Sequence, residues 1–136
     1  MVFFNFVPLF LIPLVIYISL YIIGIFPAYL NHIIFHIQLP SDAIWKPTYG
    51  DLLIITGILI LFFELFKATQ TAATSILDHI LSTFVLIAYL VMWLIYPFAG
   101  NSYFLILSLM SFLDVIAGFT ITISTARRDF GFGDRQ

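Results

Sequence analysis

An acidic residue inside a long apolar run is the first candidate for chemistry in this sequence. Asp114 stands near the middle of the apolar run from Tyr103 to about Thr125. A carboxylate at the centre of a bilayer costs about 2.5–3.5 kcal/mol even on the most lenient scale of helix insertion. We therefore expect Asp114 to be protonated, paired or directed into a wet cavity. Two interpretations stay open: the carboxyl fastens two helices together, or it binds a proton, an ion or a ligand.

Small and polar residues accompany Asp114 on one face of the helix that this run predicts. They follow the spacing of an α-helix and are Ser111, Ala117, Gly118, Thr122 and Thr125. Small residues let two helices approach closely, so we expect this stripe to pack against a neighbouring helix. Ser82 and Thr83 would lie near the level of Asp114 on the preceding helix, where either hydroxyl could donate to the carboxyl. The candidate intramembrane site for an ion or a proton comprises Asp114, Ser111, Ser82 and Thr83.

Charged residues near the ends of the apolar runs predict a second polar cluster, on the cytoplasmic side. Glu64 precedes Lys67 by three residues, a spacing that makes the two side chains neighbours on a helix. Antiparallel packing would bring this pair close to Asp78 and His79, with Arg127 near the same level. A surface ion pair and a helix cap explain these residues most simply, and a proton relay through His79 is the alternative. The predicted cluster comprises Glu64, Lys67, Asp78, His79 and Arg127.

No set of residues predicts an enzyme, a metal site or a cofactor. The chain has no Cys, and it lacks the sequence motifs of nucleophilic hydrolases, zinc proteases, phosphate-binding loops and dinucleotide-binding turns. His32 and His36 have a spacing that can bind a metal, and Asp42 could add a ligand, but a defined third ligand is missing. We therefore expect no catalytic activity, no metal and no cofactor.

The composition indicates a membrane protein of one domain. Hydrophobic residues make up 62% of the 136 residues and charged residues only 9%, whereas soluble domains contain about 25% charged residues. The chain has five Lys and Arg and a net charge of −2, which excludes nucleic acid as a partner. We expect the lipid bilayer to be its main partner.

Four apolar runs predict an all-α polytopic membrane protein with four transmembrane helices. A bilayer core takes about 20 apolar residues per helix, and the runs cover about 7–30, 51–67, 79–96 and 103–125. Pro13 is expected to kink the first helix, and a capping-box pattern at Ser75 is expected to start the third. The short turn 97–102 makes the last two helices an antiparallel hairpin, and 126–136 form a cytoplasmic tail. The whole chain, 1–136, is then a single four-helix membrane domain.

Basic residues near the ends of the runs predict the orientation. One side holds Lys67, Arg127, Arg128 and Arg135, and the other holds only Lys46. Because cytoplasmic loops carry the excess of Lys and Arg, we expect both the N-terminus and the C-terminus in the cytoplasm. Aromatic residues at the opposite boundary agree with an interfacial belt, and they are Trp45, Tyr49, Trp93, Tyr96 and Tyr103.

Three segments carry a resemblance to known proteins. They are 78–79, 114–118 and 126–131, all within the stretch 64–133. With these segments, about half of the chain resembles small uncharacterised four-helix inner-membrane proteins of Gram-negative bacteria. The resemblance implies a location in the bacterial inner (plasma) membrane and no particular activity. Small multidrug transporters also have four short helices, but the acidic residue of their first helix has no counterpart here.

Two functions are consistent with these expectations, while a membrane enzyme that uses Asp78, His79 and Glu64 is disfavoured because acid–base groups alone lack a substrate site. The first is an accessory or structural subunit of a membrane assembly, because the sequence offers no active site and little chain outside the membrane. The second is a small transporter or channel that uses Asp114. Four short helices enclose little space, so this second function requires an oligomer. The expected partners are lipids, and either other membrane subunits or further copies of the chain.

Overall fold

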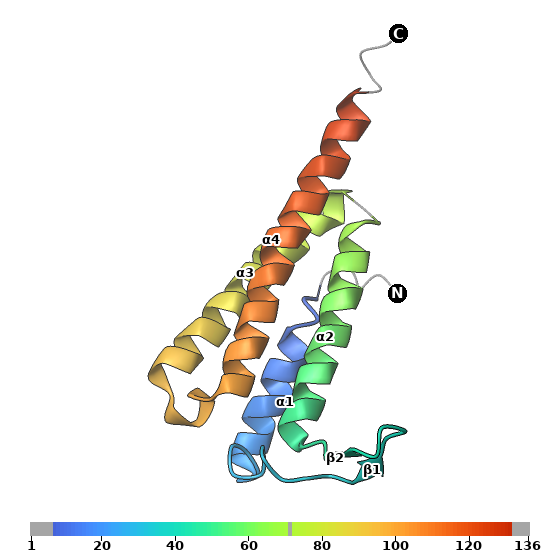
Figure 1. The fold of residues 1–136 in the computed structure, drawn as a ribbon. Helices are drawn as coiled ribbons and strands as arrows, with labels where there is room; N and C mark the ends of the chain where they lie inside the picture. Colours follow the sequence, from blue (N-terminus) through green and yellow to red (C-terminus); the bar gives the residue numbers. More distant parts are fainter. Residues whose placement is uncertain (1–6, 71, 132–136) are drawn as a thin grey trace.

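The computed structural model of the chain describes residues 7–70 and 72–131. In this part four α-helices follow one another (Figure 1): α1 (Leu11–Ile22), α2 (Tyr49–Ala68), α3 (Ala72–Ile95) and α4 (Ser102–Gly131). Two short strands, β1 (Ile37–Gln38) and β2 (Ile44–Trp45), pair between α1 and α2, and the 3-10 turn η2 (Pro97–Ala99) joins α3 to α4. Apart from the two strands, the prediction of an all-α protein is confirmed.

Three of the helices are long and apolar enough to cross a membrane. They are α2 over its 20 residues, the part Ile76–Ile95 of α3 and the part Ser102–Arg128 of α4. Large apolar side chains such as Phe62 and Phe84 are exposed on the outside, whereas the carboxyl groups of Glu64 and Asp114 are buried. Soluble proteins show the reverse distribution. The chain is therefore built as a membrane protein.

The first apolar run does not form the single long helix predicted over 7–30. α1 begins at Leu11, so Pro13 lies in its first turn. N–H groups of the first turn make no hydrogen bond within the helix, so a proline is accommodated there without a kink. α1 ends after Ile22 because Gly24 adopts a positive φ of 85°. The N–H of Gly24 and that of the next residue bond back to carbonyls of the last turn. This pattern is the Schellman motif, which stops a helix.

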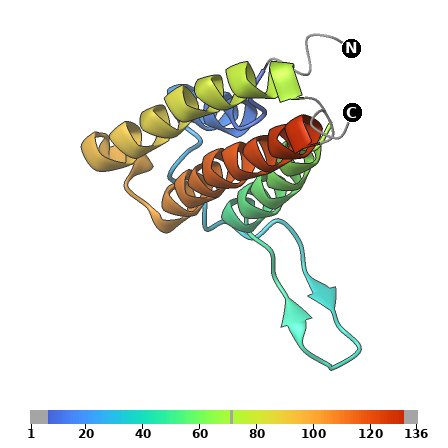
Figure 2. The same cartoon turned by 90° about the horizontal axis from the view of Figure 1, so that it is seen from above.

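Residues 31–48 form a ribbon that projects away from the helices (Figure 2). β1 and β2 pair antiparallel in it, and the turn between them contains Asp42 with a φ of 62°. The sequence predicted only a long loop here. The chain is not helical around His32 and His36, so the two residues are not brought together by one turn of a helix. Among the described residues no group of three His, Asp or Glu side chains is placed to hold a metal ion.

Two helices begin at positions other than those predicted. α2 begins directly after Thr48, because Thr48 and Asp51 close a capping box. The Thr48 N–H donates to Asp51 Oδ2 at 2.9 Å, and the Asp51 N–H donates to Thr48 Oγ1 at 3.2 Å. α3 begins at Ala72, so the backbone is already helical at Ser75 and the capping box predicted there is wrong. The preceding alanines are good helix formers and extend the helix by a turn.

α4 is the central helix and packs along both α2 and α3 (Figures 1 and 2). It continues to Gly131, so the first residues of the predicted tail 126–136 are helical. Glycines of α2 allow the close approach to α4. A Cβ added at Gly50 would lie 2.3 Å from the ring of Tyr103, and one added at Gly57 would collide with α4 in the same way.

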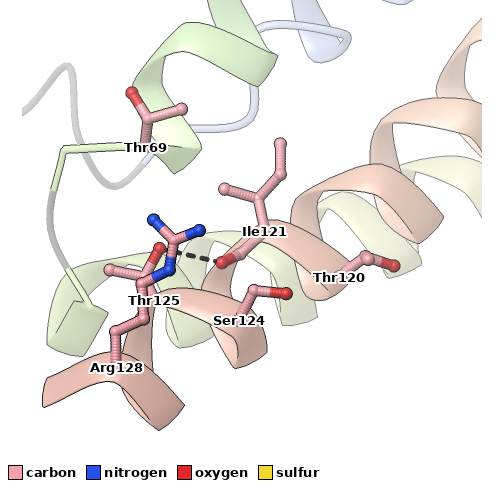
Figure 3. A pocket seen from close by; sticks show the side chains of 6 residues that line it. All are labelled: Thr69, Thr120, Ile121, Ser124, Thr125 and Arg128. Carbon is pink, nitrogen blue, oxygen red and sulfur yellow. Dashed lines mark hydrogen bonds between the residues drawn. The ribbon is translucent and has the colours of Figure 1, made fainter.

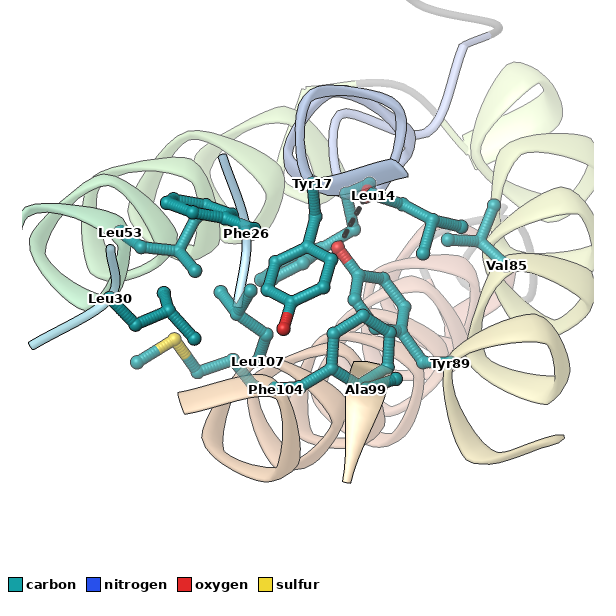
Figure 4. Packing of buried hydrophobic residues seen from close by; sticks show 12 residues of the cluster. Leu14, Tyr17, Phe26, Leu30, Leu53, Val85, Tyr89, Ala99, Phe104 and Leu107 are labelled. Carbon is teal, nitrogen blue, oxygen red and sulfur yellow. Dashed lines mark hydrogen bonds between the residues drawn. The ribbon is translucent and has the colours of Figure 1, made fainter. Parts of the chain in front are cut away.

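An aromatic core fills the space between α1, α3 and α4 (Figure 4). Tyr17 of α1 packs on Phe104 of α4 with ring centroids 4.9 Å apart, and Tyr89 of α3 packs on the same ring at 5.3 Å. Both phenol hydroxyls are paired. Tyr17 donates to the Phe98 carbonyl at 2.7 Å, and Tyr89 donates to the Phe10 carbonyl at 2.9 Å. This core holds α1 firmly against the bundle despite the shortness of the helix.

Candidate functional site: a buried charged cluster and a polar seam

Lys67, near the end of α2, lies at the centre of a charged cluster that also contains Glu64 and Asp78. Lys67 Nζ lies 2.9 Å from Glu64 Oε2, and 3.0 and 3.1 Å from the two carboxylate oxygens of Asp78. Nζ also donates to the Val7 carbonyl at 3.1 Å. The Leu9 N–H donates to Glu64 Oε1. The charged cluster therefore ties together α2, α3 and the segment before α1.

The side chains of the charged cluster are withdrawn from the surface. The exposed fraction is 1% for Glu64 and 2% for Asp78, and 11% for the Lys67 side chain. A buried ion pair adds little net stability, but removing one partner costs about 3–5 kcal/mol because an uncompensated charge stays behind. One ammonium group faces two carboxylates, so the cluster has an excess of negative charge.

His79 follows Asp78 on α3 and turns its ring toward α4. Its Nε2 lies 3.0 Å from Thr122 Oγ1, and its ring centroid lies 5.3 Å from that of Phe119. The imidazole fills the space beside Gly118, where an added Cβ would lie 2.4 Å from Cε1 and 2.7 Å from Nδ1. Nδ1 itself is buried and has no hydrogen-bond partner among the described residues. The ring therefore needs a glycine at this position of α4.

Asp114 lies one helical turn before Gly118 on α4 and is 1% exposed. Glu64, Asp78 and Lys67 lie near enough to act on it electrostatically. Its Oδ2 is buried without a hydrogen-bond partner in residues 7–70 and 72–131. The Lys67 ammonium group pairs with Glu64 and Asp78 and acts on Asp114 only from a longer range.

Two buried serines lie on the same helices. Ser82 of α3 and Ser111 of α4 are almost completely buried. Ser111 Oγ has no hydrogen-bond partner in the described part of the chain, and the Ser82 hydroxyl lies near enough to Asp114 to act on its carboxyl group. Other helical hydroxyls here donate to a carbonyl one turn back, as Ser108 does to the Phe104 carbonyl at 2.9 Å. We call the α3–α4 contact the polar seam, and its residues are His79, Ser82, Ser111, Asp114, Gly118 and Thr122.

The structure brings the two predicted sites into one polar region. The charged cluster is buried inside the bundle, near enough to Asp114 to act on it electrostatically. The Thr83 hydroxyl does not donate to Asp114, because its Oγ1 donates at 2.8 Å to the His79 carbonyl of its own helix. Arg127 is exposed on the last part of α4. It makes no ion pair with the described residues of the cluster.

An open pocket lies beyond the seam, toward the end of α4 (Figure 3). Its volume is about 510 Å³, and it is lined by Thr69, Thr120, Ile121, Ser124, Thr125 and Arg128. Sequence analysis did not predict it, because Thr69 comes from the end of α2 and meets α4 only in the folded bundle. The pocket reaches Thr125, about one turn beyond Thr122 of the seam.

The segment before α1 supplies two backbone groups that sequence analysis missed. The Val7 carbonyl and the Leu9 N–H bind the charged cluster. Pro8 between them is the one available signal, because a proline disfavours helical backbone at the residue before it. The groups on either side of Pro8 are therefore left free for other partners.

No protein-family model matches the chain, and neither a curated protein nor a solved structure was found to be similar to it. Its function has to be inferred from the site and from the surface of the molecule.

Proposed function

We propose that the chain is a small integral protein of the bacterial inner membrane that crosses the bilayer four times. α1 has only 12 residues, or about 18 Å at 1.5 Å per residue, but the run that contains it is longer. At one end the Val7 carbonyl meets Lys67 near the end of α2. At the other end the Leu30 carbonyl accepts from the Gly50 N–H, at the start of α2. The first run therefore covers the length of α2, which supports a fourth crossing.

In this arrangement α3 and α4 cross the bilayer as an antiparallel hairpin, and both termini lie in the cytoplasm. The tight turn η2 and the long contact between the two helices support the hairpin. The orientation is supported by the basic residues, since Arg128 lines one pocket with Thr69, close to Lys67 at the end of α2, whereas Lys46 lies on the ribbon before the start of α2.

Within the membrane, we propose that the protein acts as an accessory or structural subunit of a larger assembly. The observation that carries this proposal is the ribbon 31–48, which projects from the bundle and exposes apolar side chains. Contiguous apolar surface outside a compact domain marks a contact with another protein or with a membrane. The exposed apolar side chains of the ribbon are Ile33, Ile34, Phe35, Ile37, Leu39, Ile44 and Trp45.

This proposal assigns no catalytic role to the acid–base groups. Glu64, Asp78 and His79 are buried inside the bundle, away from the surface where a substrate would bind.

Photo-crosslinking from the ribbon tests the subunit proposal. A photoreactive residue in place of Phe35 or Ile44 should give one defined adduct with another protein in native membranes. A matched residue in place of Phe84, which is exposed on α3, should give lipid adducts. Ribbon positions that also give only lipid adducts would contradict the proposal.

A second candidate function is a small oligomeric transporter or channel that uses Asp114. One observation favours it, the buried Oδ2 of Asp114 that lacks a partner in the described residues. Intramembrane carboxyls of this kind often mark ion or proton paths. This function requires a homo-oligomer of fixed size, which the mass of the purified protein would reveal.

A further inference from the structure

The pocket beyond the polar seam lies where α2 ends and α4 continues. Its lining combines Thr69, which caps the end of α2, with five residues of α4 between Thr120 and Arg128. Ala68 is the last residue of α2, whereas α4 goes on to Gly131. No other helix contributes a described residue to this lining. The pocket is therefore a feature of the α2–α4 contact at its last turns.

Arg128 is the one charged group that the described residues contribute to this lining. Both ion pairs within the described part of the chain are made by Lys67, so the Arg128 guanidinium has no carboxylate partner there. The hydroxyls of Thr120 and Thr125 donate to carbonyls of their own helix, which leaves the guanidinium as the main hydrogen-bond donor. Figure 3 shows the Arg128 side chain running back along α4 beside Thr125. A guanidinium with free donors binds phosphate or carboxylate groups.

A second pocket of similar size lies at the opposite end of the contact between α2 and α4. Its volume is about 530 Å³, and it is lined by the beginnings of both helices and by Trp45 of the ribbon. Its one charged lining residue among those described is Asp51, whose carboxylate accepts from the Thr48 N–H. The two pockets therefore differ in the sign of their charge, and an anion is attracted only to the pocket of Arg128.

Both helices that line the pocket of Arg128 end their apolar spans beside it. The part of α4 that is apolar enough to cross a membrane ends at Arg128, and that of α2 ends at Ala68. Lipid head groups lie directly beyond the hydrocarbon core of a bilayer, so a lipid phosphate comes to the depth of the guanidinium. The exposed lining is otherwise mostly apolar, as at Ile121. Such a lining suits the glycerol and upper acyl chains of a lipid better than a free anion.

We propose that this pocket binds the phosphate group of a membrane phospholipid, held by the guanidinium of Arg128. The planar guanidinium donates two parallel hydrogen bonds to phosphate oxygens, and the acyl chains run along the bundle over Ile121. Basic pockets between transmembrane helices bind anionic lipid head groups in this way. The volume of about 510 Å³ lies within the range of about 300–1,000 Å³ that is usual for small-ligand sites. This inference rests on the membrane location of the protein and not on its role as a subunit.

Native mass spectrometry of the full chain in detergent tests the proposal by counting bound lipids. The wild-type protein should bind phosphatidylglycerol about tenfold more tightly than a diacylglycerol with the same acyl chains, which is the scale of one charge-assisted contact. Equal affinities for the two lipids would overturn the proposal. Inorganic phosphate at millimolar concentration should leave the first phosphatidylglycerol bound. Displacement of this lipid by inorganic phosphate would also overturn the proposal, because it would show a site for a free anion.

Two neighbouring arginines separate a defined site from a general attraction between the protein and charged lipids. Arg128→Gln should weaken binding of the first phosphatidylglycerol by about tenfold. Arg127→Gln is the matched control and should bind the lipid as the wild type does, because Arg127 is exposed and is not part of the pocket lining. Equal weakening in the two variants would refute the site. Neither result bears on the crosslinking from the ribbon, which tests the role as a subunit.

Discussion

The imidazole of His79 occupies the space that any side chain at Gly118 would need. A Cβ at position 118 would lie 2.4 Å from His79 Cε1, a separation that non-bonded carbon atoms do not adopt. This close contact positions α3 against α4 at the level of the polar seam. The position of the His79 ring depends on the absence of a side chain at Gly118.

Gly118→Ala should therefore destabilise the protein. The His79 ring would have to move away from Thr122, and overpacking of this kind costs about 1–3 kcal/mol. Thermal unfolding in detergent measures the loss. Gly131→Ala is the matched control, because an added Cβ at Gly131 meets nothing within 4 Å. Equal unfolding temperatures for both variants would show that the ring does not depend on the glycine.

Removing the ammonium group of Lys67 should be among the most damaging single changes. Lys67→Met leaves Glu64 and Asp78 as buried carboxylates without a cation, at a cost of about 3–5 kcal/mol. Lys46→Met on the exposed ribbon should leave the unfolding temperature unchanged. Adding Glu64→Gln and Asp78→Asn to Lys67→Met should recover part of the stability. A triple variant no more stable than Lys67→Met would argue against a charge effect.

The seam should accept an amide but not an apolar side chain at position 114. Asp114→Asn retains a donor and an acceptor of similar shape, so its unfolding temperature in detergent should stay near that of the wild type. Asp114→Leu should lose about 1–2 kcal/mol, the scale of a hydrogen bond between membrane helices. Wild-type stability in the Leu variant would mean that the Asp114 carboxyl makes no stabilising contact.

Much of the fold follows from the apolar runs, while the helix ends depend on local signals. The runs around Leu53, Tyr89 and Leu107 each give one long helix because their apolar residues extend over enough turns to span a bilayer. The first run breaks at Gly24, since a glycine with positive φ ends a helix whatever the hydrophobicity of its neighbours. The capping box of Thr48 with Asp51 is readable in the sequence but was not identified, and the pattern at Ser75 proved misleading.

The candidate site was predictable residue by residue but not as an arrangement. Burial of Asp114 follows from its place in an apolar run, and the approach of His79 to Gly118 follows from the mirror relation of two helices joined by a short turn. The position of Lys67 relative to Asp114 depends on how α2 packs against α4. The hydrogen bond from Lys67 to the Val7 carbonyl depends on the conformation of backbone outside any helix. Hydrophobic periodicity predicts neither of these two arrangements.

Cysteine accessibility tests the proposed orientation. The chain has no cysteine of its own, so Ser41→Cys and Gln136→Cys each carry a single thiol. A membrane-impermeant maleimide should label position 41 on intact spheroplasts, because the ribbon faces outward. Position 136 should react only after the membrane is opened. Labelling of position 136 from outside would reverse the topology.

The mass of the protein purified from native membranes tests the subunit proposal most directly. The tagged full chain is extracted in a mild detergent, and light scattering measures the protein mass of the particle. We predict a heteromeric complex of constant composition, from which the double variant Ile44→Ser, Trp45→Ser is released as the chain alone because the apolar contact of the ribbon is lost. A wild-type particle that contains only copies of this chain, or a single copy, would contradict the proposal.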